Sequence, residues 1–330
     1  MSFQAFVLRK DGDQFSAGVE TIAESDLPPG DVTVRVAWSC VNFKDGLATA
    51  RESNVVRNYP MIPGVDLAGT VESSTDSRFA KGQPVIVTGY DLGINHFGGY
   101  SELARIPADW VAPLPDGMSL KEAMALGTAG FTAALSIEAM ERMGLKQEDG
   151  TVIVTGATGG VGSTAVSMLA GRGYTVAGST GKAAEHTFLR DLGATEVLTR
   201  EEVSAESRRV METERWAAAV DPVGGATTAY LARTVKYGGS IALSGLTGGN
   251  QLNTTVYPFI LRGVNLLGIE SVWTPMAERI RLWQRMATDL KPAGLLDSIA
   301  VEAGLDGVSQ ATATILKGGV RGRVLIRVGG

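Results

Sequence analysis

The chemistry of this 330-residue chain is most visible in a glycine-rich turn at residues 155–162. A short β-branched run precedes the turn, and a helical pattern follows it over residues 161–171. Glycine lets a pyrophosphate approach the backbone, because a Cβ atom would block it. The helix N-terminus adds free N–H groups and the positive end of its dipole. The spacing Ala157-x-Gly159-x-x-Gly162, between strand and helix, predicts a dinucleotide-binding corner.

The end of the second strand in this region indicates which dinucleotide is bound. NAD-preferring sites carry an Asp or Glu there, which binds the ribose 2′-hydroxyl. Here residues 174–178 run into Ser179, Thr180 and Lys182 without a carboxylate, and Arg200 follows the third strand. A cation pairs with a 2′-phosphate that a carboxylate would repel. We therefore expect NADPH; the alternative is that both cations are simply solvated surface charges.

Alternating strands and helices position this corner. The expected strands are 151–155, 174–179, 195–199, 217–221, 239–244 and 264–269. Helical segments lie between most of them, which indicates parallel strands with helical crossovers. Six such strands predict a complete doubly wound sheet of order 3-2-1-4-5-6.

A different texture surrounds this region. Up to about residue 115 the chain consists of short strands and turns, and the tail at 320–328 is strand-like again. A capping box opens a helix at Ser119. Further helices are expected at 130–143 and 279–290. The sequence thus predicts an α/β protein in which a Rossmann domain, 123–295, is inserted into a β-rich domain formed by 1–122 and 296–330.

Composition excludes several other classes of protein. Hydrophobic residues make up 44% of the chain and charged residues 20%, as in globular proteins, and the net charge of −5 predicts neither nucleic-acid nor membrane binding. The single cysteine, Cys40, allows no intrachain disulfide and fits a reducing compartment. Without a signal peptide or an apolar stretch of about 20 residues, the chain is expected in the cytoplasm.

Several motifs resemble those of the medium-chain dehydrogenase/reductase superfamily. Residues 63–71 resemble its Pro-x-x-Gly-x-Glu-x-x-Gly-x-Val segment, with Asp66 for Glu. Residues 42–45, 127–133 and 257–262 are similar to motifs of its zinc-free acrylyl-CoA reductase group, also described as YhdH/YhfP-type quinone oxidoreductases. The resemblance implies a GroES-like catalytic domain, a Rossmann domain and NADPH in the cleft between them.

The resemblance also assigns site residues. It places the phosphate loop at Thr158, Gly159, Gly160 and Val161, and the 2′-phosphate site at Thr180, Gly181 and Lys182. Strand ends that line the nicotinamide fall at Gly245, Leu246, Thr247, Ile269, Glu270 and Ser271, and Arg321 and Arg323 lie in the closing strand. The candidate catalytic residues are Asn42, Lys44 and Asp45.

One departure from the family pattern affects the chemistry. The family usually has tyrosine in the Asn-Tyr-Lys-Asp motif, whereas this chain has Phe43. Phenylalanine packs against a nicotinamide but donates no proton. Lys44 and Asp45 are the motif-matched proton donors, bound water is an alternative, and the two residues can instead form a structural ion pair that anchors the loop.

Metal chemistry is not expected. Catalytic zinc needs three protein ligands and structural zinc four. The chain has one cysteine and two histidines, His96 in a loop and His186 in a helix. Where zinc-dependent relatives carry ligands, this chain has Asn42 and Val65.

These observations lead to one functional hypothesis with two alternatives. The resemblance implies NADPH-dependent reduction of the C=C bond of a short α,β-unsaturated acyl-CoA. The alternatives are an NADPH:quinone oxidoreductase, which uses the same hydride chemistry, and a non-catalytic NADPH-binding sensor. We also expect a homodimer.

Overall fold

The computed structural model describes residues 2–53 and 55–329, and these form two compact units. The first, the β-rich unit, comprises Met1–Thr128, Val272–Ala287 and Leu295–Gly330. The second, the nucleotide unit, comprises Ala129–Ser271 and Thr288–Gly294. Both chain ends therefore belong to the β-rich unit.

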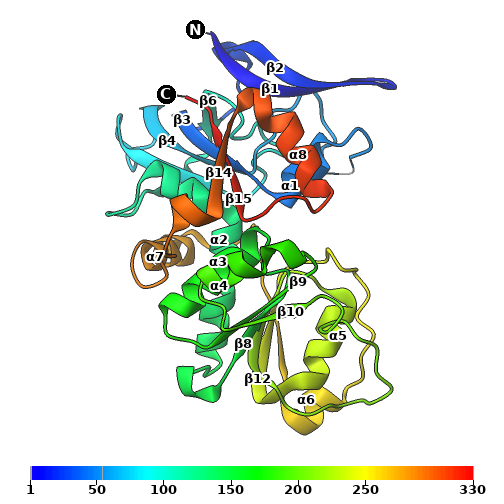
Figure 1. Ribbon diagram of the computed structural model, residues 1–330. Coiled ribbons are helices and arrows are strands. Elements are labelled where there is room, and N and C mark those ends of the chain that lie inside the picture. Colours follow the sequence, from blue (N-terminus) through cyan, green and yellow to red (C-terminus); the bar gives the residue numbers. More distant parts are fainter. Residues whose placement is uncertain (1, 54, 330) are drawn as a thin grey trace. The chain divides into compact units, whose positions relative to one another are not determined.

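Two sheets organise the β-rich unit (Figure 1). A hairpin forms the smaller sheet, and the larger sheet has the order β14-β15-β3-β4-β5-β7, with β6 also paired to β3. The strands are β1 (Ser2–Asp11), β2 (Gln14–Ala23), β3 (Val32–Val41), β4 (Asp66–Ser74), β5 (Pro84–Thr88), β6 (Leu103–Ile106), β7 (Ala112–Pro113), β14 (Ala300–Gly304) and β15 (Arg323–Arg327). The helices are α1 (Phe43–Thr49), α7 (Met276–Ala287) and α8 (Val308–Leu316). A core of buried aliphatic and aromatic side chains joins the hairpin to the larger sheet.

The nucleotide unit has the predicted doubly wound topology. Its six strands are all parallel and have the order β10-β9-β8-β11-β12-β13, which is 3-2-1-4-5-6 in chain order. The elements are β8 (Val152–Val154), α3 (Gly160–Gly171), β9 (Val176–Thr180), α4 (His186–Asp191), β10 (Glu196–Thr199), β11 (Trp216–Asp221), α5 (Gly225–Thr234), β12 (Val235–Leu243), α6 (Tyr257–Arg262) and β13 (Asn265–Gly268). Crossovers between parallel strands are almost always right-handed, which in this strand order puts helices on both faces of the sheet.

The helix α2 (Leu120–Arg142) runs through two predicted helices. Its start is the predicted capping box, in which the Ser119 and Glu122 side chains each bond to the other residue's backbone N–H. Gly127 interrupts the helix with non-helical angles, φ 51° and ψ −156°. Among the described residues α2 is the one helix long and apolar enough to cross a membrane, and 83% of its most apolar stretch is buried, as in a core helix.

The predicted boundary near residue 295 differs from the structure. Val272–Ala287 belongs to the β-rich unit, although the sequence places it in the Rossmann domain. The reason is a buried arginine of α7. Arg279 is 1% exposed, donates to the Thr88 hydroxyl at 2.8 Å and lies 4.8 Å from the centre of the Tyr90 ring. This α7 helix also begins and ends about three residues earlier than the predicted 279–290.

Candidate active site

The glycine turn of the nucleotide unit leaves room for a ligand at one position. A Cβ built on Gly159 would meet only the Gly156 carbonyl, at 3.4 Å. By contrast, a Cβ on Gly162 would collide with that carbonyl at 2.4 Å and with Ala157 Cα at 2.6 Å. Close packing of the turn on α3 thus requires Gly162, whereas packing alone does not require Gly159. The open space at Gly159 fits a pyrophosphate at the helix N-terminus.

Two threonines join the turn to the end of β9. The hydroxyls of Thr158 and Thr180 lie 3.0 Å apart, and both residues are buried. The Thr180 hydroxyl also accepts the backbone N–H of Lys182 at 3.1 Å. The sheet therefore brings together the predicted phosphate loop, which includes Gly160 and Val161 at the start of α3, and the predicted 2′-phosphate segment.

Lys182 and Arg200 form a small cationic site after β9. A Cβ on Gly181 would lie 2.8 Å from the Arg200 guanidinium, so this glycine lets the arginine cross the segment. Burial lowers the pKa of Lys182, and the nearby Arg200 charge lowers it further, while Glu185 acts in the opposite direction. Two neighbouring cations repel each other, and an anion bound between them would relieve that repulsion.

The remaining predicted cofactor residues lie at the same edge of this sheet. Parallel strands present their carboxyl ends at one edge, so the loops after β8, β9, β12 and β13 share it. Gly245 follows β12, and its Cβ would collide with the Pro222 carbonyl at 2.1 Å. Leu246 is 64% exposed. Ile269 continues the sheet by donating to the Leu243 carbonyl at 2.9 Å, and Ser271 is half-buried.

Asp221 is an organising residue of this edge that was not among the predicted site residues. It ends β11 and is fully buried. Its carboxylate accepts the hydroxyls of Thr155 at 2.6 Å and Thr228 at 2.5 Å, and the N–H groups of Val223 and Gly224. The sequence signal for this role is an acidic residue at the end of an apolar strand, because a buried carboxylate must find hydrogen-bond donors.

In the β-rich unit, Asn42 is the centre of a buried polar network. Its side-chain oxygen accepts from Arg323 at 3.1 Å, and its amide nitrogen donates to Asp66 at 2.8 Å and to Asp45 at 3.3 Å. The Asn42 side chain thus has partners on both of its ends. It holds the start of α1, and a catalytic role for Asn42 stays a prediction.

Asp66 and Arg323 extend this network across the unit. Asp66 accepts from the Cys40 thiol at 3.1 Å and from the backbone N–H and hydroxyl of Thr128, at 2.8 and 2.5 Å. Arg323 donates to Cys40 Sγ at 2.9 Å and to the carbonyls of residues 41 and 125. Gly127 lies against them, because its Cβ would come within 2.8 Å of Cys40, Asp66 and Arg323. Arg323, which was expected in the closing strand, lies in β15 and is 2% exposed within this unit.

Asp45 is fully buried and forms a cap rather than an ion pair. It accepts the backbone N–H groups of Asn42 at 2.8 Å and Val65 at 2.9 Å. Burial raises its pKa to about 7, the charge of Asp66 adds to the rise, and these N–H donors oppose it. No Lys44–Asp45 ion pair occurs within residues 2–53 and 55–329. The geometry favours the loop-anchor alternative for Asp45.

The exposed side of α1 is apolar and carries one lysine. Phe43 and Leu47 are 40% and 39% exposed, and Lys44 is half-buried. Arg321 is exposed on the loop before β15. Of the predicted residues in this unit, Phe43, Lys44 and Arg321 are therefore the ones that a bound molecule can reach.

The expected metal-ligand positions hold other roles. Asn42 and Val65 serve the network and the cap described above. The two ring nitrogens of His96 face the carbonyls of Phe97 and Pro29, and its ring packs on Trp110. His186 lies at the start of α4 as expected, is half-buried, and has a buried Nε2 atom. Across the described part of the chain, no group of three His, Cys, Asp or Glu side chains could hold a metal ion; metal independence itself stays a prediction.

Comparisons with known proteins agree with this architecture. Residues 28–116 match the alcohol dehydrogenase GroES-like domain, and residues 160–286 match the zinc-binding dehydrogenase family. The chain is 48% identical to the acrylyl-CoA reductase AcuI of Ruegeria pomeroyi, over 99% of both chains. It is 51% identical, over 99% of both chains, to Bacillus subtilis YhfP, whose name assigns it provisionally to the quinone oxidoreductases.

Solved structures show the same likeness. The yhdH oxidoreductase of Salmonella enterica in complex with NADP has a TM-score of 0.96 and 46% identity, covering 99% of this chain and 100% of that one. Bacillus subtilis yhfP with NAD bound has a TM-score of 0.97 and covers 99% of both chains. The chain therefore belongs to the medium-chain dehydrogenase/reductase family of oxidoreductases, in the group that contains the YhfP, AcuI and YhdH proteins.

Proposed function

We propose that this chain binds NADPH and uses it to reduce the C=C bond of a short α,β-unsaturated acyl-CoA. The observation that carries the cofactor assignment is the end of β9, where Lys182 and Arg200 stand in place of a carboxylate. The open space at Gly159 fits the pyrophosphate of the same molecule. Relatives solved with NADP support NADPH, and the relative solved with NAD makes the preference worth measuring.

NADPH held by the residues named above would supply the hydride for the β-carbon of the conjugated thioester. Phe43 offers an apolar ring, exposed on the first turn of α1, on which a nicotinamide can pack. The hydrogen bonds of Asn42 with Asp66 and Arg323 hold that turn in place. Pre-organisation of this kind keeps the reacting carbon close to the hydride, which is a large part of the catalytic effect in such reactions.

A proton must then reach the α-carbon. Phe43 has no proton to give, and Asp45 is buried under Asn42 and Val65. Lys44 and water remain, and both can reach the exposed side of α1. We propose that one of these two is the donor and that Asp45 is a positioning residue.

The substrate assignment rests on the likeness to AcuI along the whole chain. Quinone reduction is the second candidate, because YhfP is equally similar and carries that name. The test is to incubate the protein with NADPH and acrylyl-CoA and to follow the products by mass spectrometry. We expect propanoyl-CoA in equal amount to the NADPH consumed. NADPH binding without turnover of any enoyl-CoA or quinone would instead identify a sensor.

We further propose that the enzyme works without a metal, in the cytoplasm and as a homodimer. The single Cys40 supports a reducing compartment. The dimer is supported by exposed apolar residues next to β13, the last strand of its sheet: Val256, Tyr257, Ile260, Leu261 and Leu266. An open edge strand beside an apolar surface commonly pairs with a second chain. Light scattering of the purified protein decides this, and a monomeric mass at micromolar concentration would exclude it.

A further inference from the structure

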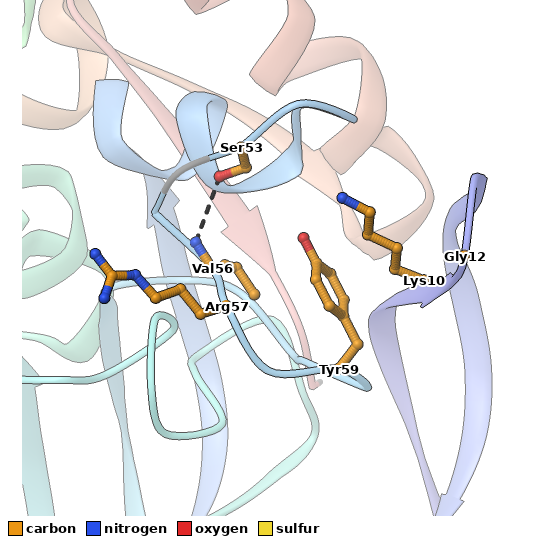
Figure 2. A pocket seen from close by; sticks show the side chains of 6 residues that line it. All are labelled: Lys10, Gly12, Ser53, Val56, Arg57 and Tyr59. Carbon is orange, nitrogen blue, oxygen red and sulfur yellow. Dashed lines mark hydrogen bonds between the residues drawn. The ribbon is translucent and has the colours of Figure 1, made fainter.

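A pocket of about 580 Å³ opens in the β-rich unit, and none of its lining residues is a predicted site residue. It lies between the turn of the β1–β2 hairpin and the segment that follows α1 (Figure 2). The lining residues are Lys10, Gly12, Ser53, Val56, Arg57 and Tyr59. Two of these residues are cations and none is a carboxylate. The volume lies in the range of pockets that hold small molecules.

The Tyr59 hydroxyl is a buried polar group without a hydrogen-bond partner among the described residues. Figure 2 shows this hydroxyl and the Lys10 ammonium pointing toward the same space, while Arg57 lies on the far side of Val56. A tyrosine phenol is neutral at neutral pH, and burial raises the pKa of Tyr59 further. Buried polar groups in folded proteins almost always have partners, so an orphan hydroxyl that lines a pocket indicates an absent acceptor.

The two cations of the pocket are also without protein partners. Within residues 2–53 and 55–329, no hydrogen bond or ion pair involves the side chain of Lys10 or Arg57. Their basic neighbours differ: Arg9 pairs with Glu20 at 2.8 Å, and Arg51 donates to the Asp13 carbonyl at 2.8 Å. A site that offers two cations and a hydroxyl donor is complementary to a phosphate.

The position of the pocket relates it to the motif at Asn42. The helix α1 starts at Phe43 and ends at Thr49, which separates its ends by about 9 Å at 1.5 Å per residue. The pocket residues Ser53, Val56, Arg57 and Tyr59 lie in the segment after this helix. Phe43 and Leu47, one turn apart on α1, are both exposed. The apolar side chains of Phe43 and Leu47 suit the flexible arm of an acyl-CoA thioester whose phosphates lie in the pocket after α1.

We propose that this pocket binds the phosphate groups of the coenzyme A part of the substrate, an inference that rests on the proposed acyl-CoA reduction. Lys10 and Tyr59 hold one phosphate, and Arg57 at the rim neutralises another. A second cavity of about 310 Å³ shares Lys10 and Tyr59 and includes Phe15 and Pro60 in its lining. Phe15 and Pro60 offer apolar contacts for the adenine, and the same lining also contains Arg9 and Asp11.

The test compares two substrates that differ only in the coenzyme part. Acrylyl-CoA carries the phosphates, whereas S-acryloyl-N-acetylcysteamine has the same reacting atoms and none. In the double variant Lys10→Ala/Arg57→Ala we expect KM for acrylyl-CoA to rise about 10-fold to 100-fold with kcat unchanged. The kcat/KM for the truncated thioester should stay the same. The matched control, Arg35→Ala/Lys81→Ala, removes two cations that pair with Glu72 elsewhere in the unit and should leave both substrates unaffected.

Tyr59→Phe separates a ligand role from a structural one. Because the hydroxyl has no protein partner, its removal should not lower Tm, yet it should weaken coenzyme A binding several-fold in isothermal titration. A lower Tm with unchanged binding would show that the hydroxyl serves the fold and would overturn the assignment.

Titration of the full-length protein with coenzyme A alone makes the result independent of turnover. If neither thioester is reduced, the proposed function fails, and loss of coenzyme A binding in the double variant still supports the pocket. If acrylyl-CoA is reduced equally well by all variants, the pocket proposal fails while the function stands. Inorganic phosphate that binds as tightly as coenzyme A would point to a free phosphate and contradict the proposal.

Discussion

At the scale of residues, two charge arrangements define the candidate site. Lys182 and Arg200 offer positive charge near the end of β9, where the strand itself ends without a carboxylate and Glu185 is the acidic neighbour of Lys182. The buried set of Asn42, Asp45 and Asp66 offers no free charge, because N–H and hydroxyl donors hold its carboxylates. The first arrangement is suited to binding a ligand, and the second to holding a loop in place.

Removal of the cationic pair should change the choice of cofactor. In Lys182→Ala we expect KM for NADPH to rise about ten-fold or more, the usual loss for one charge-assisted phosphate contact, and KM for NADH to change little. Arg200→Ala should act in the same direction. Steady-state kinetics with both cofactors measures this, with Arg190→Ala, an exposed arginine of α4, as the control. Equal use of NADPH and NADH by the unmutated protein would refute the prediction.

Asp45 should affect stability and its pH dependence more than chemistry. Its folded-state pKa, about 7, lies above the unfolded value near 4, so the folded protein binds the extra proton between these values. The Asp45 contribution is therefore present at low pH and is lost as pH rises through about 7, at up to about 1.4 kcal/mol per pH unit. Denaturant unfolding from pH 5 to 8 should show this slope in the unmutated protein and not in Asp45→Asn.

Turnover provides the second readout for that variant. As an anchor, Asp45 should leave turnover per folded molecule within about ten-fold of normal. A loss of about 10²-fold or more at unchanged folded fraction would instead make it a proton donor.

At the scale of elements, the buried strands of the nucleotide unit were predicted from the sequence, whereas short or exposed elements of the β-rich unit were missed. The six parallel strands and their order follow from continuous apolar runs such as the one that ends at Asp221. The strand β2 was missed because its side chains are mostly exposed and show no apolar alternation. With seven residues, α1 is too short to show a helical period. The buried network was missed because its members are brought together by long-range pairing, such as β15 with β3.

Two glycines of the turn allow effects on folding stability to be separated from effects on NADPH binding. Gly159→Ala places a methyl group in open space at an ordinary φ of −83°, so Tm should change little while NADPH affinity falls by about ten-fold or more. Gly162→Ala drives a methyl group into the Gly156 carbonyl, so its main effect should be a lower Tm. Thermal unfolding and fluorescence titration of both variants decide this. Normal NADPH binding by a folded Gly159→Ala protein would remove Gly159 from the site.

At the scale of the whole molecule, the two-unit organisation and the return of the tail to the first unit were predicted from texture alone. The segment Val272–Ala287 was misplaced, because the sequence does not show that Arg279 contacts Thr88 and Tyr90, nearly 190 residues earlier. The pocket at Lys10 and Tyr59 could not be predicted from the sequence either. Its lining comes from a hairpin turn and from a loop that carries no motif.

Metal removal tests the chemistry of the intact enzyme. Prolonged dialysis against a chelator should leave its rate and Tm unchanged, since the described residues contain no group of three His, Cys, Asp or Glu side chains that could hold a metal ion. Elemental analysis is the companion measurement. One zinc per chain, lost together with activity, would overturn metal independence.

The most direct measurement of the central claim is kcat/KM for acrylyl-CoA and for a benzoquinone, with saturating NADPH and the same enzyme preparation. Reduction of a conjugated thioester predicts a value for acrylyl-CoA at least about ten-fold above that for the quinone, with crotonyl-CoA as the longer-chain comparison. A quinone that turns over with far higher efficiency than either thioester would contradict the account and make quinone reduction the function of this chain.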